Sequence, residues 1–468
     1  MSGTGNSHAI VIGSSISGLL TARVLAKHYD QVTIVERDCL PEQPQARPGV
    51  PQASHVHALL TRGLEILLQL FPGLETELVA AGAVKVDWIN DWLLYGIWGL
   101  APRFASDVQS YTCSRHLLEW LIYSRLKEFQ NIQWLQATQV TGLLFGANQY
   151  RVIGVKLRSR NQAKTQNDYL PELKAELVVD ATGRNSLLLK WLETNGYDSP
   201  KETVINSFLG YASRWYQQTE NSEFDCQGII ISAQPPKQKR GGVIYPVERN
   251  RWVVTLSGIA RDYPPTDEAG FLEFARSLQS PIIYETIKNA QPLSEIYSFR
   301  ATENRLRHYE KLSKYPEGLL AVGDAVCAFN PVYGQGMTVA AIGALTLDEC
   351  LSRKHSRNYH LSRHYYKQLA QQLQIPWLMA TGEDLRWSTT SGGQLNVMSR
   401  FIQGYLDRVI RLGVDSPQLH QRFIQIAHLV KPPSALFAPP ILLQVLLSLP
   451  RERMMKRLKQ LGVEAIED

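Results

Sequence analysis

Residues 8–36 read HAIVIGSSISGLLTARVLAKHYDQVTIVE, and this stretch decides the fold class of the chain. Residues 9–12 form a short apolar run that ends at a glycine, which is typical of a buried parallel strand. Residues 17–28 carry apolar side chains at helical spacing, and residues 32–35 form a second apolar run. This order of strand, helix and strand predicts a βαβ unit, and therefore an α/β fold with a parallel sheet.

The turn between the first strand and the helix is GSSISG at residues 13–18. It matches the dinucleotide fingerprint G-x-G-x-x-G except that Ser15 replaces the middle glycine, and we expect serine to be small enough for a pyrophosphate to approach. Gly13 permits the tight turn, and Gly18 lets the helix pack closely against the strand. The free N–H groups at the start of the helix then face the phosphates. Glu36, at the end of the second strand, is placed to bind ribose hydroxyls. The alternative is a structural glycine turn with a surface glutamate.

A second glycine motif, LVVDATGRNS at residues 177–186, places a polar turn directly after a buried strand. Taken alone, this stretch is explained equally well by an ordinary strand-to-helix turn. It supports a ligand site only in combination with the other two motifs.

The third motif is GDA at residues 323–325, followed by CAFNPVYGQGM at residues 327–337. Asp324 can accept a hydrogen bond from a sugar-like hydroxyl, while Gly334 and Gly336 let backbone N–H groups approach a flat ring closely. The helix expected to start at the end of this motif points its positive end at that ring, which stabilises the negative charge of a reduced flavin. A buried glycine-rich helix start without a ligand is the alternative interpretation.

The bulk composition is that of an ordinary globular protein. Of the 468 residues, 44% are hydrophobic and 20% are charged, and the formal net charge is +6. We expect no nucleic-acid partner, because no long basic run with interleaved aromatic residues occurs. The cysteines are dispersed without a C-x-x-C pair, which favours reduced thiols and no metal site. Neither a signal peptide nor an apolar stretch of membrane-spanning length is present, so we expect a cytoplasmic protein without a transmembrane segment.

In this order, GxSxxG, Glu-Arg at residues 36–37, DATGR and GDAxxxxxPxxGxG resemble the p-hydroxybenzoate hydroxylase-like flavoproteins, also called group A flavin monooxygenases. The resemblance covers about residues 8–350. RPGVPQASHVHALL at residues 47–60 and GGVIYPVERNRWVVTLSG at residues 241–258 are similar to the branch that contains bacterial natural-product epoxidases and hydroxylases. The resemblance implies a Rossmann-like FAD-binding domain with an inserted antiparallel β-sheet substrate domain and a helical C-terminal region.

The resemblance also implies individual contacts with FAD. Glu36 corresponds to the residue that binds the adenosine ribose, while Arg37 and the backbone of Val140 meet the adenine. Arg115 corresponds to a family arginine at a helix start, and Arg47 to a loop arginine near the flavin. The full set of expected cofactor-binding residues is Gly13, Ser15, Gly18, Glu36, Arg37, Arg47, Arg115, Val140, Gly323, Asp324, Pro331, Gly334, Gly336 and Met337.

The ring end of the cofactor corresponds to the third motif. By the resemblance, Asp324 meets the ribityl chain and the pyrophosphate, and residues 331–337 form the loop that faces the isoalloxazine ring. NADPH or NADH is the implied transient reductant, because the chain has one dinucleotide fingerprint and no second nucleotide domain.

The remaining pattern divides the chain into domains. Apolar stripes predict helices over about residues 57–70 and 113–129, and beyond residue 191 short strand-like runs alternate with loops, which indicates an antiparallel sheet. We expect FAD-binding parts at 1–84, 105–190 and 300–376, substrate-domain parts at 85–104 and 191–299, and a helical C-terminal region at 377–468.

The expected function is that of an FAD-dependent monooxygenase. By the resemblance, NAD(P)H reduces FAD, oxygen adds to give a C4a-hydroperoxide, and one oxygen atom passes to an apolar or aromatic organic substrate by hydroxylation or epoxidation, in secondary metabolism. Because the cofactor does the chemistry, no catalytic side chain is assigned. The alternatives are an FAD-dependent reductase of isoprenoid double bonds and a flavin-binding protein without turnover. Flavin halogenases are less favoured, since their W-x-W-x-I-P motif is absent.

Some residues outside these motifs are candidates for the substrate cavity. His55 and His57 stand at an expected helix start, and with no further metal ligand evident we expect them to cap the helix or line the flavin cavity. The segment WINDWLLYGIW at residues 88–98 fits core packing and an apolar substrate wall equally well. Tyr245 is expected on a substrate-domain strand that faces the flavin.

Two charged stretches near the C-terminus have simpler explanations. Glu383 and Asp384 form an acidic pair that we expect on a solvated loop. The basic segment 451–459 is expected to be a helix with a solvated face, and weak contact with a membrane surface is the alternative.

Overall fold

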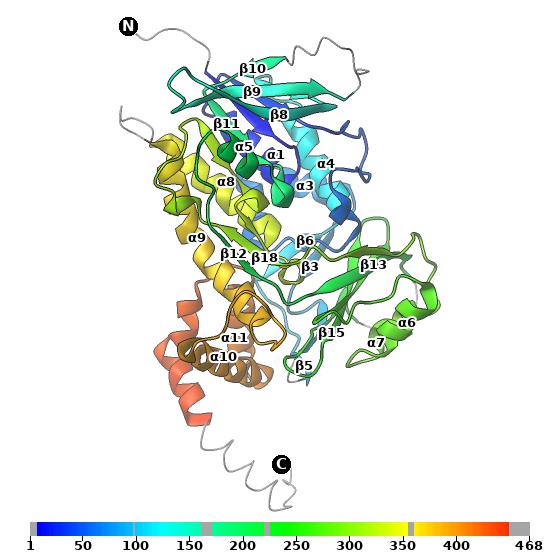
Figure 1. The fold of residues 1–468 in the computed structure, drawn as a ribbon. Helices are drawn as coiled ribbons and strands as arrows, with labels where there is room; N and C mark the ends of the chain where they lie inside the picture. Colours follow the sequence, from blue (N-terminus) through cyan, green and yellow to red (C-terminus); the bar gives the residue numbers. More distant parts are fainter. Residues whose placement is uncertain (1–6, 97–98, 161–170, 220–224, 354–359, 449–468) are drawn as a thin grey trace, which may run out of the picture.

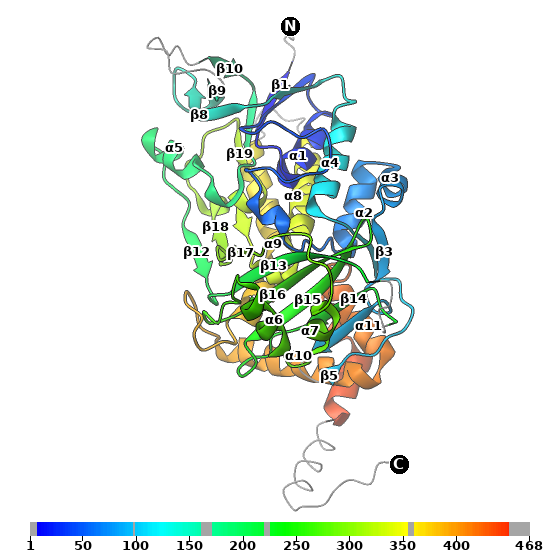
Figure 2. The same cartoon turned by 90° about the vertical axis from the view of Figure 1, so that its right-hand side faces the viewer.

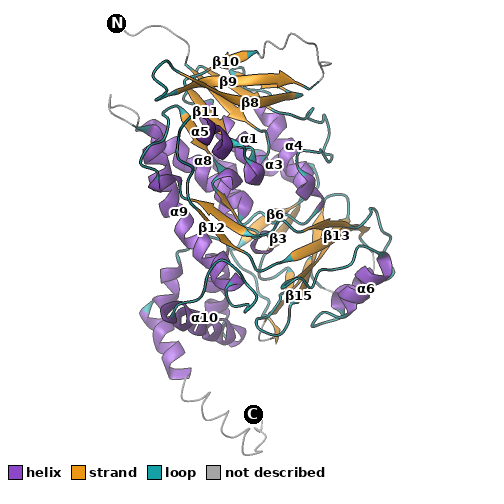
Figure 3. Cartoon of the chain, viewed as in Figure 1, coloured by secondary structure: helices purple, strands orange, loops and turns teal. Residues whose placement is uncertain are grey.

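The computed structural model describes residues 7–96, 99–160, 171–219, 225–353 and 360–448. Figure 1 shows a parallel sheet with its helices in the upper half, an antiparallel sheet at the lower right and the last helices at the lower left. Figure 3, coloured by secondary structure, separates the purely helical C-terminal layer from the two layers that contain strands. This arrangement confirms the α/β fold class with an antiparallel sheet and a helical C-terminal region.

The upper layer is built on the βαβ unit expected from residues 8–36. Strands β1 and β2 pair in parallel, with Ile10 opposite Thr33, and helix α1 connects them. These strands are continuous apolar runs because both faces of the sheet are buried. The sheet has the order β19 (Leu319–Ala321), β11 (Leu177–Asp180), β1 (His8–Ile12), β2 (Gln31–Val35) and β7 (Ile132–Leu135).

Helices and a small sheet cover the two faces of the parallel sheet. Helices α1 and α8 pack against each other on one side, and a three-stranded sheet lies on the other (Figures 1 and 2). The helices of this layer are α1 (Ile16–Leu25), α2 (Thr61–Leu70), α3 (Leu74–Ala80), α4 (Arg115–Leu126), α5 (Leu188–Thr194) and α8 (Gly336–Ser352). The covering sheet consists of β10 (Glu172–Lys174), β9 (Val152–Ser159) and β8 (Thr138–Phe145).

The lower layer is a seven-stranded sheet, antiparallel except where β4 runs parallel to β14. Its order is β17 (Tyr297–Phe299), β13 (Gly210–Gln217), β16 (Arg251–Gly258), β15 (Arg240–Val247), β14 (Gly228–Ile231), β4 (Trp92–Gly96) and β5 (Gly99–Leu100). Helices α6 (Glu268–Arg276) and α7 (Ile282–Ile287) pack on its outer face around Phe271 and Ile283, which are fully buried. The inner face is therefore left to face the parallel layer.

Two smaller sheets join the layers. One pairs β3 (Val84–Asp87) with β6 (Gln109–Thr112), and the other has the order β12 (Glu202–Ile205), β18 (Asn304–Arg307) and β20 (Cys327–Ala328). The second of these sheets carries the chain from β11 out to the seven-stranded sheet and back to β19.

The C-terminal layer consists of α9 (Leu361–Asp384), α10 (Val397–Asp415) and α11 (Pro417–Ala427), followed by a helical segment over residues 439–448. Helix α9 packs on α8, and α10 packs on α11 around the buried side chains of Tyr405, Val409 and Leu419. Within the described ranges, no helix is both long enough and apolar enough to cross a bilayer. The basic segment 451–459 lies outside the described residues.

One helix starts later than its apolar stripe predicts. The expected start was residue 57, whereas α2 begins at Thr61. The first N–H groups of this helix have no local side-chain cap, and His428 supplies a distant one: its Nδ1 accepts a hydrogen bond from the Thr61 N–H at 3.2 Å. The helix start is therefore set by a contact with the C-terminal layer, which the local sequence does not reveal.

Candidate active site

A large cavity lies between the carboxyl ends of the parallel strands and the inner face of the seven-stranded sheet. Its volume of about 480 Å³ is in the usual range for ligand and cofactor sites. Ile12 and Val35 at the ends of β1 and β2 contribute one wall, whereas Tyr211 of β13 and Phe299 of β17 come from the other layer. Open α/β sheets bind ligands at this edge, so the cavity is the candidate site.

All of the cofactor-binding residues expected from the sequence line this cavity, except Gly18 and Gly323. These two glycines lie directly behind the wall. A Cβ on Gly18 would come within 1.9 Å of the Gly13 carbonyl oxygen, and a Cβ on Gly323 within 2.0 Å of Ser17 Oγ. They let the turns pack against each other, so the first and third motifs lie side by side, as binding of a single ligand requires.

The backbone of the cavity wall fits a dinucleotide with a planar ring. Gly13 has a φ of +97°, and a Cβ there would lie 3.0 Å from the Ala181 carbonyl oxygen. A Cβ on Gly336 would meet no atom within 4 Å, so this backbone is open. Helices α1 and α8 both begin at the cavity without a side-chain cap, which leaves their first N–H groups free for a pyrophosphate and for negative charge on a ring. The residues present therefore fit FAD.

Glu36 is held as an ionised acceptor at the cavity. It is 4% exposed, and its Oε2 accepts hydrogen bonds from the Ser14 N–H at 2.8 Å and the Ser14 hydroxyl at 2.6 Å. Its Oε1 accepts from the Asp38 N–H at 3.0 Å, and the Arg47 guanidinium lies 3.2 Å from Oε2. Burial by itself would raise the pKa of Glu36, but Arg47 and these hydrogen bonds lower it overall.

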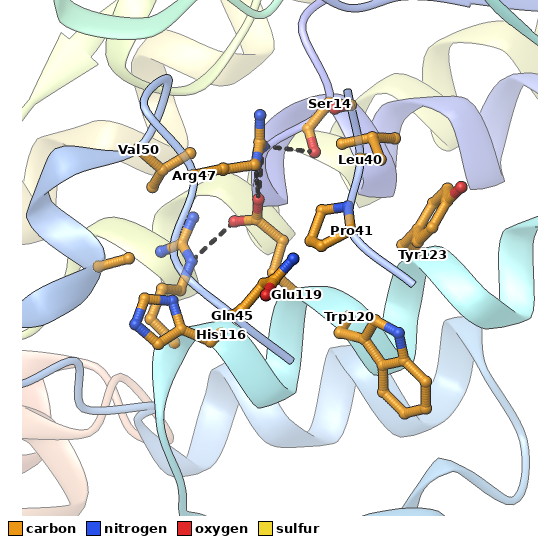
Figure 4. Close-up of a pocket in the computed structure, with 12 residues that line it drawn as sticks. Ser14, Leu40, Pro41, Gln45, Arg47, Val50, His116, Glu119, Trp120 and Tyr123 are labelled. Atoms are coloured by element: carbon orange, nitrogen blue, oxygen red, sulfur yellow. Dashed lines mark hydrogen bonds and ion pairs between the residues drawn. The ribbon is translucent and has the colours of Figure 1, made fainter. Parts of the chain in front are cut away.

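Glu119 is a residue that sequence reasoning missed, and Figure 4 shows its carboxylate beside Arg47. Its Oε1 accepts from Arg47 Nε, and its Oε2 accepts from Arg115 Nε, both at 3.0 Å. Arg115 also donates to Ser15 Oγ at 2.8 Å, and this hydroxyl donates to Glu119 at 3.0 Å. Glu119 thereby ties the fingerprint turn, the loop of Arg47 and helix α4 together. The i, i+4 spacing of Arg115 and Glu119 on an expected helix is the signal that could have identified it.

The second motif braces the third. Arg184 of the DATGR turn donates to the Phe329 carbonyl oxygen at 2.9 Å and pairs with Glu303 at 3.3 Å. Asp324 lines the cavity beside this turn; burial raises its pKa, and the positive charges of Arg184 and Arg115 partly offset that rise. The DATGR stretch is therefore part of the cavity and not only a strand-to-helix turn.

The two histidines occupy different places, and neither caps helix α2. His57 lines the cavity, and its Nδ1 donates to the His55 carbonyl oxygen at 3.0 Å, which leaves Nε2 as an acceptor. Burial lowers the pKa of His57 to about 3, so the ring is neutral near pH 7. His55 is bonded to Ser213 Oγ at 2.8 Å and lies edge-on behind Tyr211. The expectation of helix capping was wrong, whereas His57 does line the cavity.

Of the two interpretations given for the aromatic residues of segment 88–98, core packing holds for Trp92 and for Trp88, which packs against it. Trp88 and Trp92 stack with ring centroids 4.7 Å apart, and neither lines the cavity. Tyr245 lies on β15, the expected substrate-domain strand, and points toward the parallel layer, where it donates to the His57 carbonyl oxygen at 3.2 Å; it is 1% exposed and does not itself line the cavity. The physical reason is that β15 directs Tyr245 into the aromatic cluster around Trp92. Trp98 lies outside the described residues.

The acidic pair at residues 383–384 was expected on a solvated loop, but both residues lie at the end of helix α9, and only Glu383 is partly exposed. Asp384 is the last residue of α9 and is 0% exposed. Tyr333 donates to its Oδ1 at 2.7 Å, beneath the loop that holds Pro331 and Gly334. No local pattern marks this residue, because its partners come from other parts of the chain.

Comparisons with known proteins agree with this geometry. The family model of the FAD binding domain matches residues 6–355. Protein Rv3254 of Mycobacterium tuberculosis (strain ATCC 25618 / H37Rv) is 34% identical over 362 residues, which cover 76% of this chain and 75% of that protein.

Solved structures share the fold at low identity. The flavin-dependent brominase Bmp2 has a TM-score of 0.65 at 16% identity, covering 90% of this chain and 94% of its own. PqsL, a probable FAD-dependent monooxygenase from Pseudomonas aeruginosa, has a TM-score of 0.59 at 16% identity, covering 81% of this chain and 98% of its own. With the family match and the FAD-shaped cavity, the chain belongs to the FAD-binding family of p-hydroxybenzoate hydroxylase-like, or group A, flavoproteins, and it is an FAD-dependent oxidoreductase.

Proposed function

We propose that this protein is an NAD(P)H-using monooxygenase that transfers one oxygen atom of O2 to an apolar or aromatic organic substrate, by hydroxylation or epoxidation. The observation that carries the proposal is the composition of the cavity. The loop of Pro331 and Gly334 and the aromatic side chains of Tyr211 and Phe299 line the same cavity. A ring held by the loop would therefore share this space with an apolar substrate held by the seven-stranded sheet.

The residues proposed to hold FAD form separate parts of the cavity, and each part suits one chemical group of the cofactor. Gly13, Ser15 and the start of α1 offer N–H groups to the pyrophosphate, and Glu36 accepts from the adenosine ribose. Arg37 and Val140 line the wall where the adenine is proposed to lie.

The ribityl chain and the ring are proposed to meet the third motif. Asp324 accepts from ribityl hydroxyls, and residues 331–337 face the isoalloxazine. When bound, FAD supplies electron uptake from NAD(P)H and activation of oxygen. The chain itself orients the ring and substrate and excludes water.

His57 is proposed to position a polar group in the cavity. Its ring is neutral near pH 7 because burial lowers its pKa to about 3, and Nε2 has no hydrogen bond among the described residues. A neutral acceptor in the cavity orients a ligand hydroxyl or N–H without adding charge. We therefore assign His57 a binding role and no role as a general base.

The alternatives predict different products. A reductase of isoprenoid double bonds consumes NAD(P)H without oxygen uptake, and a binding protein shows no stimulation by any substrate. Bmp2 and the chondrochloren halogenase CndH, which share the fold, are halogenases, so halide-dependent product is a further outcome to exclude. We propose residues 85–104 and 191–299 as the substrate-binding part in each case.

The deciding experiment is NAD(P)H oxidation by FAD-loaded protein with a panel of apolar and aromatic compounds under labelled oxygen, with and without bromide. We expect one compound to stimulate oxidation and to gain one labelled oxygen atom. Tyr211→Ala should raise the KM for that compound roughly tenfold, because it removes an aromatic wall, and leave FAD affinity unchanged. Tyr365→Phe, which alters a buried tyrosine outside the cavity whose hydroxyl has no hydrogen bond among the described residues, is the control. Oxygen-independent oxidation or unlabelled product would contradict the proposal.

A further inference from the structure

We propose that Asp384, on the C-terminal helix α9, is an ionised positioning residue that holds the loop over residues 330–336 in the shape that receives the flavin ring. This inference rests on the proposal that residues 331–337 face that ring. Asp384 lies beyond residues 6–355, the part that matches the FAD binding domain. The C-terminal layer would then contribute a residue that shapes the cofactor site.

The carboxylate of Asp384 is surrounded by donors. Its Oδ1 accepts from Tyr333 Oη at 2.7 Å, and its Oδ2 accepts from Asn304 Nδ2 at 2.7 Å. Asn330 Nδ2 lies 3.1 Å from both oxygens. Asp384 is 0% exposed, so water cannot replace any of these partners without opening the structure.

The orientation of both amides is determined by backbone donors. Asn304 Oδ1 accepts from the Asn330 N–H at 2.8 Å, and Asn330 Oδ1 accepts from the Val332 N–H at 3.2 Å. An N–H group can only donate, so the oxygen of each amide must point at it. The amide nitrogens therefore face Asp384 and donate to its carboxyl oxygens, and an ionised carboxylate accepts such hydrogen bonds most strongly.

The carboxylate has no cationic partner among the described residues, since no ion pair joins it to an arginine, lysine or histidine. The neighbouring Glu383 instead faces Arg386 at 3.3 Å, with 43% of its side chain exposed. Asp384 is thus a buried negative charge that is stabilised only by neutral N–H and O–H groups. A buried charge of this kind is retained where its hydrogen bonds determine a conformation.

The residues that Asp384 holds flank the proposed ring-facing positions. Asn330 immediately precedes Pro331, and Tyr333 immediately precedes Gly334, and both Pro331 and Gly334 line the cavity. Gly334 has a φ of +65°, which glycine adopts about as readily as a negative φ, so the glycine itself does not fix the shape of the loop. Loss of the carboxylate should therefore loosen the loop and also remove a negative charge that opposes electron uptake by a nearby ring.

The test compares Asp384→Asn, which has the same shape without the charge, with Glu383→Gln as the matched control. FAD affinity of the apoprotein is measured by quenching of flavin fluorescence, and the bound flavin is characterised by its midpoint potential and visible circular dichroism. We expect Asp384→Asn to bind FAD roughly tenfold more weakly, with a more positive midpoint potential and an altered dichroism spectrum. Glu383→Gln should match the parent in all three measurements.

Tyr333→Phe provides a second variant that keeps the charge. It removes one donor, so we expect a several-fold loss of FAD affinity, an altered dichroism spectrum and a smaller shift in potential than for Asp384→Asn. If Asp384→Asn does not fold, Tyr333→Phe carries the test alone.

Parental FAD affinity, potential and dichroism in a folded Asp384→Asn, or parental affinity and dichroism in Tyr333→Phe, would overturn the proposal, whatever happens to thermal stability. These readouts need no substrate. The proposed monooxygenase activity can therefore fail while the role of Asp384 stands, and the reverse also holds.

Discussion

Two buried polar networks border the same cavity, and their charges are balanced in different ways. The first, here called the arginine network, consists of Glu36, Asp38, Arg47, Arg115 and Glu119, in which both arginines pair with carboxylates. The second, here called the Asp384 network, consists of Asp384, Asn304, Asn330 and Tyr333, in which one carboxylate meets only neutral donors.

The difference indicates that the two networks have different structural roles. In the arginine network each ion compensates another, so the network can border a site for an anionic pyrophosphate without leaving a bare charge. In the Asp384 network the carboxylate orients two amides and a phenol, which in turn hold a loop. Removing one ion from the first should therefore affect folding most, and altering the second should affect the geometry of the cofactor site.

The largest effect is expected from Glu119→Ala. Arg47 and Arg115 have 8% of their side chains exposed, and Glu119 has 12%, so the substitution leaves Arg115 without a carboxylate in a poorly solvated place. We expect a loss of about 3 kcal/mol in the free energy of unfolding, measured by chemical denaturation of the apoprotein. Glu65→Ala, which breaks an exposed pair with Arg62, is the control and should change it by less than about 0.5 kcal/mol. Equal losses of unfolding free energy in Glu119→Ala and Glu65→Ala would contradict the prediction that the buried arginine network contributes more stability than an exposed ion pair.

A smaller effect is expected in the Asp384 network from Asn304→Ala. Asn304 is 0% exposed, and its removal leaves the Asn330 N–H and one lone pair of Asp384 unsatisfied. We expect a loss of about 2 kcal/mol in the free energy of unfolding. Gln31→Ala, which removes an exposed amide hydrogen bond to Gln133, should be close to neutral in the same denaturation experiment. A loss larger than that of Glu119→Ala would reverse the order of the two networks.

The smallest effect, and the sharpest contrast, is in the sign of the pH dependence. Burial raises the pKa of Asp384 above its ordinary value of 3.8, because the hydrogen bonds from Asn330, Tyr333 and the other donors only partly offset it. The folded state therefore takes up this proton before the unfolded state does. As the pH falls from neutral through the folded pKa, the parent should gain stability relative to Asp384→Asn.

Glu36 should show the opposite slope. Burial acts to raise its pKa, but Arg47 and the hydrogen bonds from Ser14 and Asp38 lower it below the ordinary value of 4.5. Its stabilising contribution is complete above the unfolded value and is lost as the pH falls through the folded pKa, so the parent should lose stability relative to Glu36→Gln. Apparent melting temperatures of both pairs, measured between about pH 3 and 7 so that the range extends below the ordinary pKa of Glu36, test the contrast. Slopes of the same sign would contradict it.

The fold class and the cofactor followed from local sequence. The strand, turn and helix over residues 8–25 and the third motif are recognisable because glycine conformations and helix starts are set by neighbouring residues. Twelve of the fourteen expected cofactor residues line the cavity, and the other two, Gly18 and Gly323, lie directly behind its wall. The expected contacts of these residues with FAD stay predictions.

The side chains that support the cavity were harder to predict. Glu119 had a local signal in its spacing from Arg115, whereas Asp384 had none. Tyr245 lies on the same face of the seven-stranded sheet as Tyr211, but the loop that carries His57 covers it, and the sequence does not reveal where that loop lies. The predicted start of helix α2 was too early in the sequence, because the residue that caps the helix, His428, comes from the C-terminal layer.

The sequence by itself determined that this chain binds FAD in a parallel α/β layer, because phosphates and a flat ring are recognised by backbone N–H groups at short glycine turns. Only the tertiary structure decided which carboxylates support the wall of that site, namely Glu119 beneath the two arginines and Asp384 beneath the ring-facing loop. Arg47 meets Glu119 across 72 residues and Asn304 meets Asp384 across 80, and contacts of that range depend on how whole layers pack.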